Sequence, residues 1–183
     1  TLAILAGLRQ GELFGLHWED VDLKRGTLTV RRNLTEVRGK LELGPPKSRS
    51  SRRTLTLPNV AVDSLGQQRA VLMAEGLAAC PLVFPDSRGG FLRKSNFLRN
   101  VYQPLREAAG IKPVRFHDLR HTNATLLLTE GVHPKVVQAR LGHSQISLTL
   151  DTYSHVIEQV DQEAAAKLDN AISAYTVATQ VSH

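Results

Sequence analysis

Cysteine is almost missing from this chain of 183 residues, which has Cys80 alone. A single thiol excludes an internal disulfide and a cysteine-rich zinc site, and it fits a reducing compartment. Long apolar runs are missing too, since no stretch of about 18 apolar residues exists, which excludes a membrane-spanning helix. No basic segment followed by an apolar stretch opens the chain, so we expect no signal peptide and a cytoplasmic location.

Acidic residues are scarce between residues 24 and 53. Only Glu36 and Glu42 oppose ten cations there, an excess of eight, whereas the net charge of the whole chain is +6. Solvated protein surfaces normally mix charges of both signs. We therefore interpret this stretch as a surface for a polyanion. The arginines expected to contact DNA are Arg31, Arg32, Arg49, Arg52 and Arg53.

The remaining composition is that of an ordinary globular protein, with 42% apolar residues and enough length for one domain with a full core. Apolar residues recur with helical spacing in several segments and alternate in others. We predict an α+β domain that is mainly helical, with a small three-stranded antiparallel sheet near the N-terminus. Strands are expected in residues 27–33 and 53–57, and residues 37–41 are expected to turn into a second strand that lies between them in sequence. The helices are expected in residues 59–75, 95–110, 117–131, 134–141 and 156–175, followed by a frayed tail over 176–183.

Residues 117–153 contain an unusual set of polar side chains. His117 and Arg120 are three residues apart on a predicted helix and therefore lie on one face. His143 follows the next predicted helix, and Tyr153 comes ten residues later. Arginine binds phosphate oxygens through two parallel donors, and a tyrosine hydroxyl becomes a nucleophile when a base removes its proton. This set suits a site that binds a phosphate and attacks it.

A metal site formed by His117, His121 and His143 is the weaker interpretation of the same stretch. Histidines four residues apart on a helix can bind one metal ion, but no acidic ligand accompanies them at the usual spacing. We therefore predict no metal ligands.

The order of these motifs resembles the catalytic signature of the tyrosine recombinases, the phage integrase family. The matching segments are His-x-x-Arg at 117–120, Leu-Gly-His at 141–143 and Tyr153. Upstream, Gly-Leu-Arg-x-x-Glu-Leu at 7–13 and Lys-Ser-x-x-Ser-x-Arg at 47–53 resemble two further motifs of that family. The resemblance covers nearly the whole chain.

The resemblance implies a site-specific DNA recombinase that breaks and rejoins strands by transesterification. Tyr153 would attack a phosphodiester, form a 3′-phosphotyrosyl link and release a 5′-hydroxyl. Arg9 and Arg120 would bind the non-bridging oxygens, with a hydrogen bond from His143. The resemblance also implies that His117 accepts the proton of Tyr153 and that Lys47 protonates the leaving oxygen. Glu12 would support Arg9 without touching the phosphate.

The resemblance also implies partners and an origin. We expect double-stranded DNA at an attachment or crossover site, a tetramer on synapsed DNA, accessory directionality or DNA-bending proteins, and no cofactor. We expect a bacterial or phage enzyme of a mobile element, and a catalytic domain cut from a protein with N-terminal DNA-clamp or arm-binding domains. The helix over 156–175 would fold back on its own domain or dock on a neighbouring subunit.

Two other functions remain open on the sequence alone. A type IB topoisomerase uses similar chemistry but relaxes DNA without exchanging partners, and the short chain and the Leu-Gly-His motif speak against it. A non-catalytic DNA-binding module of the same fold would be expected to lack one of the motif residues, and all of them are present.

Overall fold

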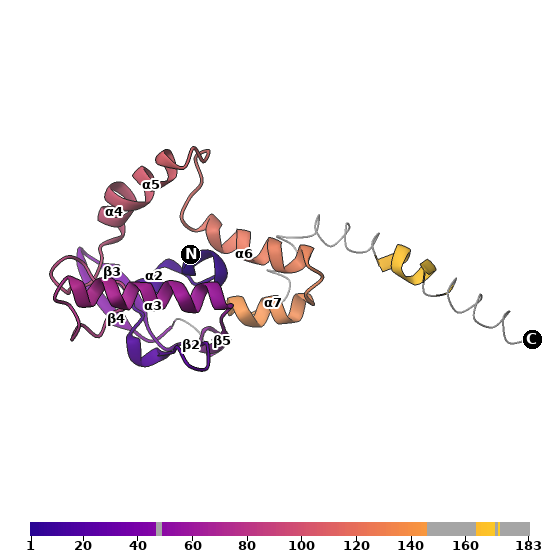
Figure 1. Cartoon of the computed structure of the whole chain (residues 1–183), viewed down its shortest axis with the longest axis horizontal. Coiled ribbons are helices and arrows are strands. Elements are labelled where there is room, and N and C mark those ends of the chain that lie inside the picture. Colours follow the sequence, from indigo (N-terminus) through magenta and orange to yellow (C-terminus); the bar gives the residue numbers. More distant parts are fainter. Residues whose placement is uncertain (47–48, 146–163, 171, 173–183) are drawn as a thin grey trace, which may run out of the picture.

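The structure is a computed structural model, and it describes residues 1–46, 49–145, 164–170 and 172. Short helices and strands make up the first third of the chain, and helices dominate the described residues that follow it (Figure 1). The mainly helical α+β fold predicted from the sequence is therefore confirmed.

The elements of the first part are α1 (Leu2–Leu5), α2 (Gln10–Phe14), the 3-10 turn η1 (Trp18–Asp20), β1 (Val21–Asp22), β2 (Thr27–Val30), β3 (Asn33–Val37), β4 (Lys40–Gly44), the 3-10 turn η2 (Arg49–Ser51) and β5 (Arg53–Thr56). The later elements are α3 (Asn59–Ala74), α4 (Lys94–Phe97), the π-helical turn η3 (Leu98–Tyr102), α5 (Gln103–Ala108), α6 (Asp118–Thr129) and α7 (Pro134–Leu141).

The predicted three-stranded sheet exists, but the expected pairing of its strands was wrong. β2 lies between β1 and β5 in an antiparallel sheet, and Leu28 of β2 lies opposite Leu55 of β5. The strand expected over 27–33 stops at Val30, and its continuation β3 pairs with β4 in a separate two-stranded sheet. Alternation of apolar residues predicts strands, but it does not say which strands pair.

A tight turn explains why β3 takes β4 as its partner. Val37 lies opposite Lys40, so Arg38 and Gly39 alone form the loop, and their φ angles are +50° and +78°. Positive φ at both loop residues is the geometry of the two-residue hairpin turn that matches strand twist. The local hairpin therefore forms between neighbours in sequence, and β5 is left to pair with β2.

The main core packs the sheets against α1, α2 and α3. Leu28, Leu55, Leu65 and Val83 are among its fully buried side chains. Val83 belongs to the long connection between α3 and α4. This core fixes the position of α2 relative to β5, and both elements contribute to the candidate active site.

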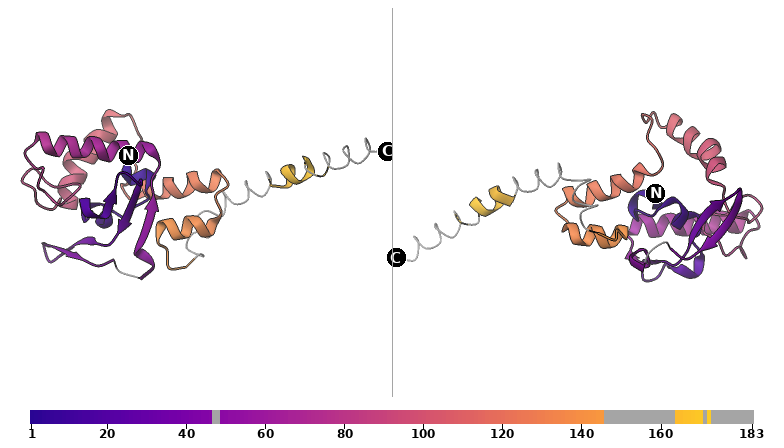
Figure 2. Two further views of the ribbon diagram at one scale, coloured as in Figure 1. Left: turned by 60° about the horizontal axis from the view of Figure 1, so that its bottom comes forward. Right: turned by 180° about the vertical axis from the view of Figure 1, so that it is seen from behind.

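Helices α6 and α7 form an antiparallel pair beside the part of the molecule that holds α3 and the sheets, as Figures 1 and 2 both show. Ala124, Leu128, Val137 and Leu141 form a second buried cluster between the two helices. Pro134 stands at the first turn of α7, where its missing N–H costs nothing. The predicted helices over 117–131 and 134–141 are thus confirmed, and the end of α7 is brought against β5.

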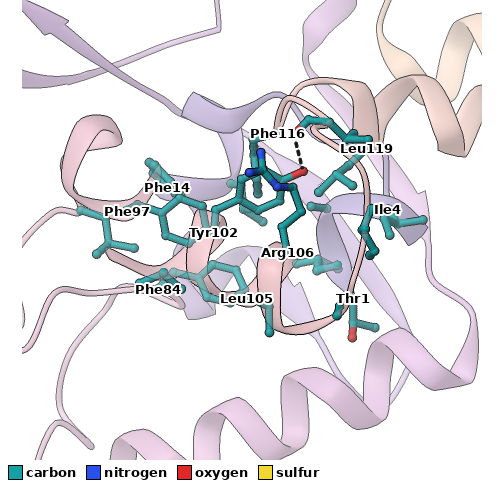
Figure 3. Close-up of a pocket in the computed structure, with 18 residues that line it drawn as sticks. Thr1, Ile4, Phe14, Phe84, Phe97, Tyr102, Leu105, Arg106, Phe116 and Leu119 are labelled. Atoms are coloured by element: carbon teal, nitrogen blue, oxygen red, sulfur yellow. Dashed lines mark hydrogen bonds between the residues drawn. The ribbon is translucent and has the colours of Figure 1, made fainter. Parts of the chain in front are cut away.

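An apolar cavity of about 470 Å³ lies beside η3 and α5 (Figure 3). Phe97 and Tyr102 meet Phe116 edge-on with ring centroids 5.3 and 5.2 Å apart. The hydroxyl of Tyr102 donates a hydrogen bond to the Val114 carbonyl at 3.1 Å. Tyr102 therefore belongs to an apolar cluster, and burial raises the pKa of its phenol.

The helix predicted over 156–175 falls mostly outside the described residues. Residues 164–170 and 172 are helical, and Leu168 and Ile172 are exposed. None of the helices in the described ranges is long and apolar enough to cross a membrane.

Candidate active site

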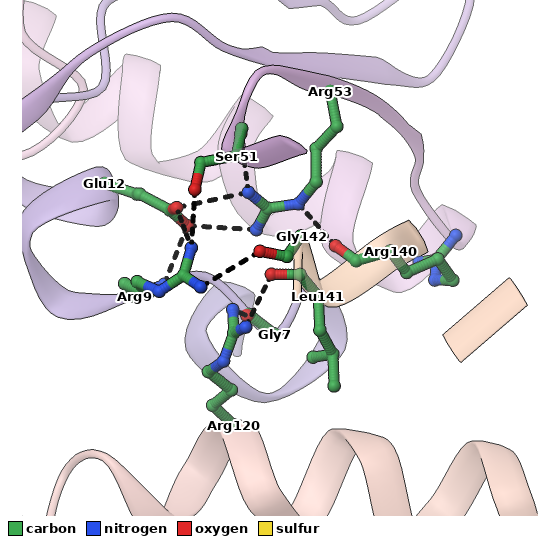
Figure 4. Close-up of polar contacts among 9 residues, drawn as sticks. All are labelled: Gly7, Arg9, Glu12, Ser51, Arg53, Arg120, Arg140, Leu141 and Gly142. Carbon is green, nitrogen blue, oxygen red and sulfur yellow. Dashed lines mark hydrogen bonds and ion pairs between the residues drawn. The ribbon is translucent and has the colours of Figure 1, made fainter. Parts of the chain in front are cut away.

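Arg9 stands at the start of α2 and is fixed by Glu12, one turn further on. The backbone N–H of Arg9 donates to Oε2 of Glu12 at 2.9 Å, and its Nη1 donates to Oε1 at 2.9 Å. The same guanidinium donates to Ser51 Oγ at 3.2 Å and to the Gly142 carbonyl at 3.0 Å (Figure 4). The Arg9 side chain remains 36% exposed, so a phosphate in solvent can approach it.

Glu12 is buried, with a side chain that is only 2% exposed, and it pairs with a second arginine. Nη1 of Arg53 donates to Oε1 of Glu12 at 3.1 Å, and Nη2 donates to Oε2 at 3.0 Å. Burial alone would raise the pKa of Glu12, but the hydrogen bonds and charges of Arg53 and Arg9 outweigh it and lower that pKa. Glu12 is therefore ionised at neutral pH and holds two cations.

Arg120 approaches the same place from α6 and is itself buried. Its Nη1 donates to the Gly7 carbonyl at 2.6 Å, and its Nη2 donates to the Leu141 carbonyl. Leu141 and Gly142 are consecutive residues, and their carbonyls accept from Arg120 and Arg9 respectively (Figure 4). The two arginines are thus held by neighbouring peptide groups.

His143 directly follows these two carbonyls. Gly142 ends α7 with a φ of +66°, a conformation that favours glycine, and thereby turns the chain toward His143. Nε2 of Gln138 donates to the His143 carbonyl at 3.2 Å. Burial, together with the charges of Arg120, Arg9 and Arg53 and a contribution from His121, lowers the pKa of His143 to about 4. The imidazole is therefore neutral at pH 7, with one nitrogen that donates and one that accepts.

His117 lies at the start of α6, on the exposed side of the site. Its ring meets the ring of His121 edge-on, with centroids 5.1 Å apart. Burial, the neighbouring His121 and the charge of Arg120 lower the pKa of His117. A neutral, accessible imidazole can accept a proton.

Two predicted catalytic residues, Lys47 and Tyr153, lie outside the described residues. Among the others, Arg9 and Arg120 bind the two carbonyls that precede His143, and the charge of Arg120 acts on both His143 and His117.

The five arginines predicted to contact DNA do not all lie in the same environment. Arg31 and Arg52 are exposed, although Nε of Arg31 is 3.5 Å from a carboxylate oxygen of Asp20. Arg32 forms ion pairs with Asp20 and Glu19. The side chain of Arg53 is 7% exposed and pairs with Glu12 inside the site. The side chain of Arg49 lies outside the described part of the chain.

Sequence reasoning missed that Arg53 belongs to the site, although the sequence contains a signal for it. Arg53 is two residues before Leu55 in an alternating strand, so it lies on the same face as that buried leucine. Ser51 is the second serine of the Lys-Ser-x-x-Ser-x-Arg motif, but no role was predicted for it, and its hydroxyl accepts a hydrogen bond from Arg9.

No three side chains of His, Cys, Asp or Glu gather into a metal-binding group among the residues that the structure describes. The cations of the site are arginines, which stabilise negative charge without a metal ligand set.

Comparison with known proteins identifies the family of this chain. Residues 1–159 match the sequence model of the phage integrase family. The chain belongs to the phage integrase family. Among its relatives, a tyrosine recombinase XerC-like protein of Caldanaerobacter subterraneus subsp. tengcongensis is 35% identical over 187 residues, which cover 92% of this chain and 48% of that protein. The prophage integrase IntR of Escherichia coli K12 is 30% identical over 193 residues, covering 93% of this chain and 46% of IntR.

Solved structures of this tyrosine recombinase family share the fold. The Tn1549 transposon integrase in complex with circular intermediate DNA aligns with a TM-score of 0.73 at 23% identity, over 91% of this chain and 57% of that chain. The XerA recombinase aligns with a TM-score of 0.70 at 24% identity, over 89% of this chain and 55% of that chain. This integrase-family chain spans about half the length of the curated relatives it matches.

Proposed function

We propose that this chain is the catalytic part of a site-specific DNA recombinase that exchanges strands through a 3′-phosphotyrosyl intermediate. One observation carries the proposal. Arg9 and Arg120, 111 positions apart in the sequence, donate to the consecutive carbonyls of Gly142 and Leu141, which immediately precede His143. Membership of the phage integrase family supports the same chemistry.

The two arginines would bind the non-bridging oxygens of the scissile phosphate. Negative charge grows on these oxygens as the nucleophile approaches, and donors fixed in advance stabilise it without reorganisation. Arg120 is fixed by Gly7 and Leu141, and Arg9 is fixed by Glu12. Neutral His143 would donate one further hydrogen bond, and removal of one such donor typically slows a reaction by about 10²- to 10³-fold.

Proton transfers would be divided between two residues. His117 would accept the proton of Tyr153 as its oxygen attacks phosphorus, and the 3′-phosphotyrosyl bond forms. Lys47 would protonate the 5′-oxygen as that bond breaks. A 5′-hydroxyl from another strand reverses the same steps, so the energy of the phosphodiester is kept and no high-energy cofactor is required.

The substrate would be double-stranded DNA at a specific site. The exposed Arg31 and Arg52 and the net charge of +6 support a polyanionic partner. The solved XerH recombinase is bound to its difH substrate, and a lambda integrase fragment is bound as a dimer to a core site. For this chain we propose four copies on two synapsed sites in the cytoplasm, with accessory proteins that set direction.

A trapping experiment tests the proposed function. This chain is incubated with a pool of duplexes of randomised sequence that carry a nick, so that a short 5′-hydroxyl fragment leaves after cleavage and cannot rejoin. We expect a covalent protein–DNA adduct on a denaturing gel, and we expect a 5′-hydroxyl acceptor strand to release the protein by joining the trapped strand. DNA binding without any adduct would instead support a non-catalytic module.

A further inference from the structure

Arg53 lies in an enclosed position, whereas an arginine that contacts DNA would be expected on the surface. It is the first residue of β5, lies opposite Val30 of β2, and its side chain is 7% exposed. The sheet therefore directs this guanidinium into the protein. All three nitrogens of the Arg53 guanidinium donate to acceptors within the protein.

The donors of Arg53 connect three separate segments of the chain. Its Nη1 and Nη2 bind both oxygens of Glu12 on α2, at 3.1 and 3.0 Å. Its Nη1 also donates to the Ser51 carbonyl at 2.9 Å, and its Nε donates to the Arg140 carbonyl near the end of α7 (Figure 4). The Arg53 side chain packs closely against Gly142 at the end of α7, since a Cβ on Gly142 would lie 3.0 Å from Nη1 of Arg53.

Sharing of one carboxylate has an electrostatic consequence. A pair of Arg9 with Glu12 alone would be neutral and would offer a phosphate little net attraction. Arg53 adds a second cation to the same carboxylate, so the three groups together carry one positive charge. Because Arg53 is enclosed and Arg9 is not, that charge is presented to solvent through Arg9.

We propose that Arg53 is a positioning residue for strand transfer, which fixes Glu12 and thereby Arg9, and which anchors the end of α7 so that His143 stays beside both arginines. This inference rests on the proposed function for its effect on rate. Arg53 touches no reacting atom, so its influence on the reaction passes through Glu12, Arg9 and the backbone before His143.

Three variants test this role. Arg53→Gln removes the charge and the bidentate contact, whereas Arg53→Lys keeps the charge but cannot span both oxygens of Glu12. Arg88→Gln is the matched control, because it removes one arginine charge from an exposed loop. Thermal unfolding first establishes that each variant is folded.

The first readout is the titration of His143 by NMR, which requires no catalysis. Among the residues that the structure describes, the charged or titratable groups that act on His143 are Arg120, Arg9, Arg53 and His121. Loss of the Arg53 charge should raise the pKa of His143, whereas Arg53→Lys and Arg88→Gln should leave it near the wild-type value.

The second readout is the single-turnover rate of adduct formation at saturating DNA, measured together with the affinity for DNA. We expect both Arg53 variants to be slower by about 10²-fold, the usual effect of a misplacement of about 1 Å in an active site. Their affinity for DNA should match that of wild type, because Arg53 does not face the duplex. Arg88→Gln should keep the wild-type rate.

Several outcomes would overturn the proposal. The first is an Arg53→Gln variant in which both the pKa of His143 and the single-turnover rate are unchanged. The second is a variant that binds DNA more weakly but forms the adduct at the wild-type rate. The third is unfolding of both Arg53 variants, which would make the residue structural only. If wild type forms no adduct while the pKa of His143 still rises in Arg53→Gln, the proposed function fails and the positioning of His143 by Arg53 stands.

Discussion

Substitution of Glu12 by Gln should destabilise the protein more than any exposed carboxylate substitution. The change keeps the shape of the side chain but leaves the enclosed Arg53 without its anion. Breaking a buried pair by removing one partner costs about 3–5 kcal/mol. For a domain of this size, about 1 kcal/mol corresponds to a Tm shift of roughly 2–4 °C, so Glu12→Gln should lower Tm by roughly 6–20 °C.

The matched control for this prediction is Glu19→Gln. Glu19 also pairs with an arginine, Arg32, but its side chain is 62% exposed. Exposed ion pairs contribute about 0–1 kcal/mol, so the control should shift Tm by a few degrees at most. Equal shifts in the two variants would refute the reasoning that the buried Glu12 carboxylate holds the site together.

The pH dependence gives the same prediction a second test. The folded-state pKa of Glu12 lies below its ordinary value of 4.5, so its contribution to stability is fully present above pH 4.5 and is lost as pH falls through the folded pKa. The stability difference between wild type and Glu12→Gln should therefore be constant near neutral pH and shrink below pH 4.5. The lowered pKa of His143 costs stability as pH falls from 6.5 toward about 4, but it does so in both proteins and largely cancels in the difference.

Three further predictions concern the leaving group, the DNA and the end of α7. Lys47→Ala should slow cleavage of normal DNA by about 10²- to 10⁴-fold and should be rescued by a 5′-bridging sulfur, whose departure needs no proton, whereas Arg120→Ala should not be rescued. If the 5′-bridging sulfur rescued Arg120→Ala and not Lys47→Ala, then Arg120 would be the proton donor and Lys47 would bind the phosphate. Removal of both Arg31 and Arg52 should reduce the log–log salt slope of DNA binding by about 1.8, at roughly 0.9 for each phosphate contact, and an unchanged slope would mean that neither contacts DNA. Gly142→Ala should cost about 1 kcal/mol or more in chemical unfolding, because its φ is +66° and the added Cβ would lie 3.0 Å from Ser50 O, and wild-type stability would contradict this close packing.

Local patterns in the sequence predicted the helices that build the site, but not the contacts that complete it. The helical spacing before Gly131 and the proline at position 134 define α6 and α7 correctly, because both signals depend on residues a few positions apart. The pairing of β3 with β4 depends on the backbone angles of a two-residue turn, and apolar alternation does not determine those angles.

The role of Arg53 shows the same limit within the site. Its partner Glu12 is 41 positions away in sequence, and its other contacts are backbone carbonyls, which have no sequence signature. The positive charge of Arg53 suggested a contact with DNA, although its position two residues before Leu55 in an alternating strand indicated burial. Where the two signals conflict in a strand, the face that a residue occupies is the better guide to its environment.

The most direct test of the proposed chemistry is the identity of the residue that becomes attached to DNA. Adduct from the nicked duplex pool is digested with protease, and the peptide that carries the nucleotide is sequenced by mass spectrometry. We predict attachment at Tyr153 through a 3′-phosphate, and no adduct from Tyr153→Phe although that variant still binds DNA. Attachment at Tyr102 or Tyr175, or an adduct that persists in Tyr153→Phe, would contradict the assignment of the nucleophile.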